Sequence, residues 1–202
     1  MTIKAVFFDF GGVIGRTVDN GPRQRQADRL GLSLKSLAEA AFFRESARRA
    51  TLGEISESAH WVEVMHNLGL PEGQAPSFSE EFFSGDQLDQ ALLAFIRSLR
   101  PAYRAGLISN AWSGLRGYIV QEKFEDAFDE MIISAEVGIA KPDPTIFHLA
   151  LERFGIQPAE AVFVDDFPEN VEAARTTGLF AIHFKQAEVA LDELKKLLAD
   201  HK

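Results

Sequence analysis

The sequence contains no cysteine and no long hydrophobic run. Without cysteine the chain has no disulfide framework, no thiolate metal site and no cysteine nucleophile. The apolar run at residues 5–8 is interrupted by Asp9, which makes it too short for a signal peptide or a membrane span. We therefore expect a cytoplasmic protein that has no membrane partner.

The chain also has fewer positively than negatively charged residues. The sequence has 21 Lys and Arg against 30 Asp and Glu, which gives a net charge of −9. A surface of this sign repels polyanions, so we expect no nucleic-acid partner. Hydrophobic residues make up 46% of the 202 positions, enough for one sizeable core with a smaller subdomain attached. A monomer and a homodimer both remain open.

The two ends of the chain have the pattern of βαβ units. Apolar residues 5–8 precede Gly11 and Gly12, which is typical of a strand buried on both faces of a parallel sheet. After Pro101, helical stretches separate four more strand-like runs, at residues 105–109, 131–134, 161–164 and 179–184. The pattern predicts an α/β fold with a mostly parallel sheet.

The segment between these two parts has the periodicity of helices. Over about residues 17–99 the apolar side chains recur at helical spacing, as at Leu34, Leu37, Ala38, Ala41 and Phe42. Glycine, proline and serine mark breaks in this pattern, at Gly31, Gly53, residues 69–71 and residues 84–85. We predict about four helices and a further one over residues 87–99. Residues 15–85 would then be an all-helical insertion in an α/β domain formed by residues 1–14 and 86–202.

Polar residues follow four of the predicted strands. They are Asp9, the pair Ser109-Asn110, Lys141 in the loop after the third strand, and the pair Asp165-Asp166. Because parallel strands present their carboxyl ends at one edge, where ligands of open α/β folds bind, we expect these side chains to converge. Each alone has a structural explanation as a turn former, a helix cap or a solvated loop residue. Their order at successive strand ends favours a catalytic site.

Four motifs resemble those of a known family. They are FFDFGGV at residues 7–13, LISN at 107–110, KPD at 141–143, and VFVDD at 162–166 followed by Asn170. In this order they resemble the haloacid dehalogenase (HAD) superfamily, and the match spans nearly all of the predicted α/β domain. The resemblance implies a doubly wound, Rossmann-like core, and it identifies residues 15–85 as a helical cap.

The resemblance also implies a hydrolase whose nucleophile is the Asp9 carboxylate. Attack on phosphorus gives an aspartyl-phosphate that water then hydrolyses, so one difficult displacement becomes two easier ones. A carboxylate that approaches a phosphate dianion is repelled, so a divalent cation is expected between them. The family pattern places Mg²⁺ on Asp9, the Gly11 carbonyl and Asp166, with Asp165 and Asn170 bound to the cation or to its ligands.

The remaining motif residues are expected to bind the phosphoryl group of a small phosphate ester. Lys141 supplies a compact positive charge that holds the nucleophile and the transferring oxygens together. The Ser109 hydroxyl and the amides of Asn110 and Ala111 are expected to donate hydrogen bonds to phosphate oxygens.

One position departs from the phosphatase pattern. Phosphatases of the superfamily usually carry a second Asp two residues after the nucleophile, and this chain has Gly11 there. General acid–base catalysis contributes ~10²–10⁴-fold, so an ester with a poor leaving group should turn over slowly. Anomeric sugar phosphates and acyl phosphates need that proton less. Superfamily members with Gly at this site include phosphatases, and a phosphatase remains the favoured hypothesis.

Two alternatives stay open. In a metal-independent 2-haloacid dehalogenase Asp9 attacks carbon, but such members tend to have uncharged residues where this chain has Asp165 and Asp166. That pair repels a carboxylate substrate when no cation is present. A non-catalytic, ligand-binding homologue is supported by Gly11 alone. The sequence also leaves open the substrate and the specificity roles of three residues near the motifs, Trp112, Arg16 and Arg23.

Overall fold

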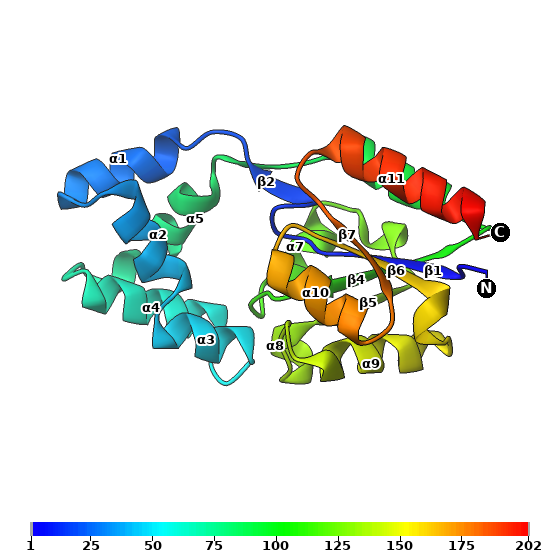
Figure 1. Ribbon diagram of the computed structural model, residues 1–202. Helices are drawn as coiled ribbons and strands as arrows, with labels where there is room; N and C mark the ends of the chain where they lie inside the picture. The colour runs from blue at the N-terminus through cyan, green and yellow to red at the C-terminus, as the bar shows by residue number, and fades with distance from the viewer. Residues whose placement is uncertain (1, 202) are drawn as a thin grey trace.

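The computed structural model describes residues 2–201, which are built around a five-stranded sheet (Figure 1). All neighbouring strands are parallel, in the order β5-β4-β1-β6-β7. The strands are β1 (Ala5–Phe8), β4 (Arg104–Ser109), β5 (Glu130–Ile133), β6 (Ala161–Asp165) and β7 (Phe180–His183). The predicted α/β class and parallel sheet are confirmed, and the first strand lies at the centre.

Helices cover both faces of the sheet, because successive side chains of a strand point to opposite faces. Val6 and Phe8 pack on one face with α6 (Gln90–Ser98), α7 (Leu115–Gln121) and α11 (Ala187–Asp200). Ala5 and Phe7 pack on the other face with α9 (Pro144–Phe154) and α10 (Pro168–Thr176). The short elements of this part are α8 (Ser134–Val137) and the 3₁₀ turns η2 (Glu125–Ala127) and η3 (Pro158–Glu160). The sheet is therefore doubly wound, as predicted.

Residues 21–83 form a helical insertion between β2 and β3. Its elements are α1 (Gly21–Leu30), α2 (Leu34–Phe42), α3 (Glu45–Thr51), α4 (Glu57–Asn67), the 3₁₀ turn η1 (Glu72–Gln74) and α5 (Ala75–Phe83). The helices enclose a hydrophobic cluster of their own that includes Trp61 and Phe82. In Figure 1 the insertion lies on the side toward which β1 runs, and both chain termini lie on the opposite side.

The prediction that residues 17–99 are entirely helical is wrong at one point. β2 (Gly15–Thr17) pairs antiparallel with β3 (Asp86–Leu88). The helix predicted from residue 87 therefore begins only after Asp89, whose side chain accepts a hydrogen bond from the Leu92 amide at 2.9 Å. These two strands pair across the whole insertion, and such pairing produces no local periodicity from which it could be predicted.

The insertion also has five α-helices where about four were predicted. The unpredicted break falls between α2 and α3, at residues 43–44, which include neither glycine nor proline. The breaks predicted at Gly31 and Gly53 are present, and both glycines have positive φ. No helix within residues 2–201 has both the length and the apolar character that crossing a membrane requires.

Candidate active site

The carboxyl ends of the parallel strands bring three of the sequence-identified residues into contact. Asp9 directly follows β1, and Asp165 ends the neighbouring strand β6. Lys141 comes from the loop between α8 and α9, and its Nζ lies 2.9 Å from Asp9 Oδ1 and 2.6 Å from Asp165 Oδ2. All three side chains are buried. The site is thus assembled from segments that are far apart in the sequence.

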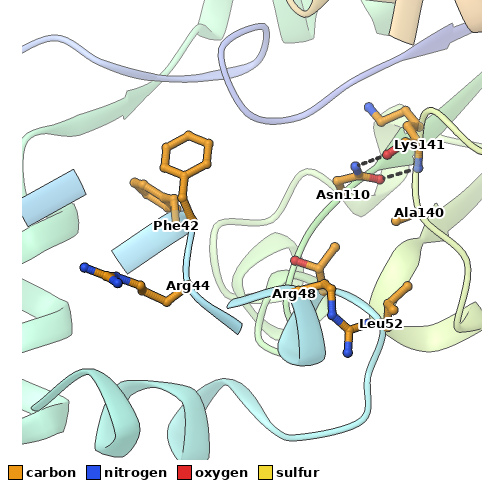
Figure 2. Close-up of a pocket in the computed structure, with 9 residues that line it drawn as sticks. Phe42, Arg44, Arg48, Leu52, Asn110, Ala140 and Lys141 are labelled. Carbon is orange, nitrogen blue, oxygen red and sulfur yellow. Dashed lines mark hydrogen bonds between the residues drawn. The ribbon is translucent and has the colours of Figure 1, made fainter. Parts of the chain in front are cut away.

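Further interactions fix the position of Lys141. Its Nζ donates to the Ile108 carbonyl of β4 at 2.9 Å, so three oxygens surround an ammonium that has three protons. Asn110 clamps the backbone of the same residue: Asn110 Nδ2 donates to Lys141 O, and Lys141 N donates to Asn110 Oδ1, both at 2.8 Å. Figure 2 shows this pair of bonds. The positive charge is therefore held in one place beside Asp9.

Asp165 anchors Lys141, and both of its carboxylate oxygens are occupied. Oδ1 accepts from the Phe167 amide at 2.7 Å and from Asn170 Nδ2 at 3.1 Å. Oδ2 accepts from Lys141 Nζ at 2.6 Å and from Asn170 Nδ2 at 3.1 Å. A carboxylate with this many donors is less available to a cation than the resemblance implies. The contacts favour a positioning role for Asp165 and Asn170.

Asp9 has one oxygen held and one free. Oδ1 accepts from the Phe10 amide at 2.7 Å and faces Lys141 at 2.9 Å, whereas Oδ2 makes no hydrogen bond within residues 2–201. Burial raises the pKa of Asp9 to about 7, against the lowering effect of the Lys141 charge. A carboxylate fixed through one oxygen can present the other to an electrophile.

Asp166 faces the same space with an unsatisfied oxygen. Its Oδ1 is buried and has no hydrogen-bond partner in the part of the chain that the structure describes. Burial, and then the charge of Asp165, raise the pKa of Asp166 to about 6. Gly12 makes room for this side chain: a Cβ at position 12 would lie 2.1 Å from Asp166 Oδ2, and the φ of 75° also favours glycine. Sequence reasoning missed this requirement for Gly12.

The residues present fit a divalent cation. One carboxylate oxygen each from Asp9, Asp165 and Asp166 lies within 4.8 Å of the other two. Lys141 balances one of these charges, so three ionised carboxylates leave an excess of negative charge. A buried oxygen without a partner, as at Asp166, is unfavourable unless it is protonated or bound to a cation. An all-oxygen donor set suits Mg²⁺.

Gly11 lies at the rim of this cluster. It is exposed, and apart from its two chain neighbours no heavy atom of residues 2–201 would lie within 4 Å of a Cβ added there. In the surrounding turn Gly15 N donates to Phe10 O and Gly12 N donates to Gly15 O, each at 2.9 Å. Neither bond uses the Gly11 carbonyl, which therefore stays available as the ligand that the resemblance implies.

The expected phosphate-binding residues differ in their availability. Ser109 ends β4 and is buried at the same edge. The Asn110 side chain is engaged by the backbone of Lys141. The Ala111 amide donates to Ser134 Oγ at 3.0 Å, so the expectation that this amide is free for phosphate oxygens is not supported by the geometry. Sequence reasoning missed Ser134, although it follows β5 and the same strand-end rule points to it.

Three residues whose roles were left open are engaged within the protein. Arg16 forms an ion pair with Asp89, which directly follows β3, and Arg23 forms one with Asp86, the first residue of β3. Trp112 packs among the aromatic side chains of the insertion, including Phe42. These contacts join the insertion and its connections to the sheet domain.

A cavity of about 350 Å³ lies between the insertion and the sheet domain. The sheet domain contributes Asn110, Ala140 and Lys141, and the insertion contributes Phe42, Phe43, Arg44, Arg48, Thr51 and Leu52. Figure 2 shows the two walls, with the Asn110–Lys141 clamp on one side and residues of α2 and α3 on the other. The volume is in the range of pockets that bind small molecules.

Residues 3–178 match the family model described as haloacid dehalogenase-like hydrolase. The chain belongs to this family. The resemblance inferred from the four motifs is thereby confirmed, and the protein is a HAD-like hydrolase.

Named relatives of this HAD-like hydrolase cover different parts of it. The phosphoserine phosphatase of Thermus thermophilus is 48% identical over 158 residues, which is 74% of this chain and 57% of that protein. The D-ribitol-5-phosphate phosphatase of Bacteroides thetaiotaomicron is 27% identical over 87% of this chain and 89% of its own length. Bifunctional epoxide hydrolase 2 of Sus scrofa is 29% identical over 98% of this chain, which spans only 39% of that protein.

Solved structures support the HAD fold. A HAD-like family hydrolase from Porphyromonas gingivalis has a TM-score of 0.79 and 24% identity, with 98% of each chain covered. A HAD family enzyme from B. thetaiotaomicron, in complex with magnesium and inorganic phosphate, has a TM-score of 0.75 and 23% identity over 92% of this chain and 96% of that one. A structure described as a dehalogenase has a TM-score of 0.71 and 20% identity over 98% of this chain and 97% of that one.

The raised pKa values predict how the stability of the metal-free HAD-like hydrolase depends on pH. The ordinary value for both carboxyls is 3.8, whereas the folded-state pKa is about 7 for Asp9 and about 6 for Asp166. Between about pH 4 and pH 7 the folded state therefore binds more protons than the unfolded state, and the free energy of unfolding falls as pH rises. We expect EDTA-treated protein to melt several degrees lower at about pH 8 than at about pH 6.

Two comparisons isolate this effect. Asp166→Asn removes one of the two groups, so its metal-free protein should lose less stability between the two pH values. Added Mg²⁺ should raise the melting temperature more at the higher pH, because the cation competes with protons for the same oxygens. A metal-free melting temperature that does not differ in its pH dependence between the wild type and Asp166→Asn would contradict the prediction.

Proposed function

We propose that this HAD-like hydrolase is a phosphoric monoester hydrolase that acts on a small phosphorylated metabolite through an aspartyl-phosphate at Asp9. One observation carries the proposal: within residues 2–201, Asp9 Oδ2 accepts no hydrogen bond and Asp166 Oδ1 has no partner, while Lys141 Nζ lies 2.9 Å from Asp9 Oδ1. Relatives named as phosphatases support the same chemistry.

The reaction proceeds in two displacements at phosphorus. Asp9 Oδ2 forms a bond to phosphorus as the P–O bond to the substrate alcohol breaks, and the alcohol leaves with a proton taken from solvent. A water molecule then attacks phosphorus and gives up a proton, and the bond to Asp9 breaks. Inorganic phosphate and the free carboxylate are the products.

The neighbouring residues prepare Asp9 for this attack. Lys141 fixes Oδ1 and neutralises part of the charge, which turns Oδ2 toward the phosphoryl group. Asp165, with Asn170, holds Lys141 in place. The Ser109 hydroxyl and the backbone amide of Asn110 donate to phosphate oxygens.

Mg²⁺ would be held by Asp9, Asp166 and the Gly11 carbonyl, and when bound it would screen the charge between the carboxylate and the phosphate dianion. Asp165 is assigned to Lys141 instead, since both of its oxygens are already occupied.

The helical insertion, within residues 15–85, is proposed to act as a cap. It lies on the side toward which β1 runs (Figure 1), and its helix α3 contacts α8 of the sheet domain. A Cβ at Gly53 would lie 2.1 Å from the Ala135 carbonyl, and Glu57 Oε2 accepts from the Gly114 amide at 3.1 Å. Such contacts suit a cap that closes over a small substrate and excludes water.

The proposal is tested by phosphate release from a panel of sugar, nucleotide, acyl and acid phosphates, with Mg²⁺ and with EDTA. We expect hydrolysis of at least one ester with Mg²⁺, loss of that activity with EDTA, and recovery when Mg²⁺ is returned. Beryllium fluoride, a mimic of the phosphoryl group, should bind at Asp9, as fluorine NMR would detect.

Other outcomes would replace the proposal. No turnover across the panel with Mg²⁺ or Mn²⁺ would reject a phosphatase. Chloride release from a 2-haloacid in the presence of EDTA would establish a dehalogenase. Ligand binding without turnover and without a beryllium fluoride complex would establish a non-catalytic homologue.

A further inference from the structure

Asp165 and Asp166 are neighbours in the sequence, but the protein holds them in different ways. The Asp165 side chain accepts hydrogen bonds on both of its oxygens, including one from Lys141 Nζ at 2.6 Å. Asp166 Oδ1 is buried, and it has no partner among residues 2–201. A side chain that its own oxygens do not hold is directed by its backbone and by the atoms around it. The direction of the Asp166 carboxylate therefore depends on what fixes its backbone.

His183 holds that backbone from the neighbouring strand. It ends β7 and pairs in register with Asp165, the last residue of β6. The backbone bond beside this pair runs from the Phe184 amide to the Asp165 carbonyl at 2.8 Å. One residue further along the chain, His183 Nε2 lies 3.0 Å from the Asp166 carbonyl oxygen. The imidazole thus adds a side-chain hydrogen bond at the point where the backbone ladder between β6 and β7 ends.

The acceptor determines the direction of this hydrogen bond. A carbonyl oxygen can only accept, so His183 Nε2 carries a proton and donates it. The side chain of His183 is half-buried, so the bond is partly shielded from water that would compete for the same carbonyl. The bond holds the turn between β6 and α10 just after the chain leaves the sheet.

Gly12 confines the Asp166 side chain from another direction. A Cβ at position 12 would lie 2.1 Å from Asp166 Oδ2, so the carboxylate lies directly against the backbone of the turn that follows β1. An oxygen of this carboxylate lies within 4.8 Å of an oxygen of Asp9. With its carbonyl held by His183 and its carboxylate against Gly12, Asp166 is ordered before a cation binds. Such ordering lowers the cost of binding.

We propose that His183 is a positioning residue for the cation ligand Asp166, whose carboxylate it directs toward the cation site by holding the Asp166 carbonyl. His183 lies 17 residues beyond Asp166 and outside the four motifs. This inference rests on the Mg²⁺ site of the proposed function. Partners that orient metal ligands in this way contribute about 10–100-fold to metal affinity.

Magnesium titrations of His183 variants test the assignment. By titration calorimetry on metal-free protein without substrate, His183→Leu should bind Mg²⁺ about tenfold or more weakly than the wild type, because leucine has no donor. His183→Met should weaken binding in the same way, which repeats the result with a more flexible apolar side chain. His183→Gln, whose side-chain amide can donate to the same carbonyl, should recover most of the affinity.

His148→Leu is the matched control. His148 is an exposed histidine of α9, so the same chemical change there should leave the Mg²⁺ affinity at the wild-type value. The metal-free melting temperature reports the structural part of each substitution. A lower melting temperature of His183→Leu with wild-type Mg²⁺ affinity would mean that His183 only stabilises the fold, and would overturn the inference. Equal losses of affinity in His183→Leu and His183→Gln would also overturn it, because the donor would then have no role.

Turnover distinguishes this inference from the proposed function. In the phosphate-release assay, the Mg²⁺ concentration for half-maximal activity should rise in His183→Leu by the same factor as the dissociation constant, whereas kcat at saturating Mg²⁺ should change much less. Wild-type Mg²⁺ affinity in all three His183 variants, together with Mg²⁺-dependent phosphate release, would overturn the inference and leave the proposed function intact. The expected loss of Mg²⁺ affinity in a protein that hydrolyses no ester of the panel would reject the proposed function and keep the role of His183.

Discussion

Asp9→Asn is expected to lower kcat for every phosphate ester by on the order of 10⁴-fold or more, the effect of removing a nucleophile. The amide has nearly the size of the carboxylate, but it is not a nucleophile toward phosphorus. Its oxygen can still accept from the Phe10 amide and face Lys141 Nζ, so the geometry around Oδ1 is retained. Phosphate release measures the loss, and beryllium fluoride should no longer bind.

The melting temperature and a matched Asp→Asn variant provide the controls for this substitution. Asn removes a buried carboxyl whose pKa is raised to about 7, so the metal-free variant should melt no lower than the wild type at about pH 8. Asp28→Asn makes the same chemical change at an exposed position of α1 and should keep full activity. Substantial turnover by well-folded Asp9→Asn protein would exclude Asp9 as the nucleophile.

Gly11→Asp is expected to raise kcat for alkyl phosphates by ~10²–10⁴-fold, the usual contribution of a general acid–base group. Position 11 is exposed and its φ is outside the left-handed region. In the described part of the chain, only its two sequence neighbours come within 4 Å of a Cβ placed there. A carboxyl two residues beyond Asp9 can protonate the leaving alcohol and then accept a proton from the attacking water. Steady-state kinetics on glycerol 3-phosphate measures the gain.

Two variants separate proton transfer from other effects at this position. Gly11→Asn has the same shape but no proton to transfer, so it should not accelerate the reaction. The gain in Gly11→Asp should shrink for acyl phosphates, whose leaving groups need no proton. Equal kcat values for Gly11→Asp and Gly11→Asn on the alkyl ester would reject the acid–base explanation.

Substitution of the neighbouring Gly12 is expected to lower kcat rather than raise it. A Cβ at Gly12 would lie 2.1 Å from Asp166 Oδ2 on a backbone with φ of 75°, so Gly12→Ala must displace Asp166. Two adjacent glycines that look alike in the sequence thus differ in what they permit. That difference depends on Asp166, which arrives from another strand, and it has no signature in the local sequence.

The strands and the edge of the sheet could be predicted from the sequence, because each depends on local properties. The buried run at residues 5–8 and the later strand-like runs are visible as continuous apolar segments. Asp9 and Asp165 come directly at the ends of such runs, and parallel strands place those ends at one edge. The pairing of β2 with β3 could not be predicted from the sequence, because it joins segments on opposite sides of the insertion.

By itself the sequence determined the α/β class, the edge where the polar motifs meet and the carboxylate-rich character of the site. Only the tertiary structure decided which groups are occupied: Asp165 accepts hydrogen bonds on both oxygens, the Ala111 amide donates to Ser134, and Asp9 Oδ2 accepts no hydrogen bond from residues 2–201. The reason is physical: hydrophobic periodicity and motif order belong to the chain, whereas the partners of a polar atom depend on distances between segments that meet only in the folded protein.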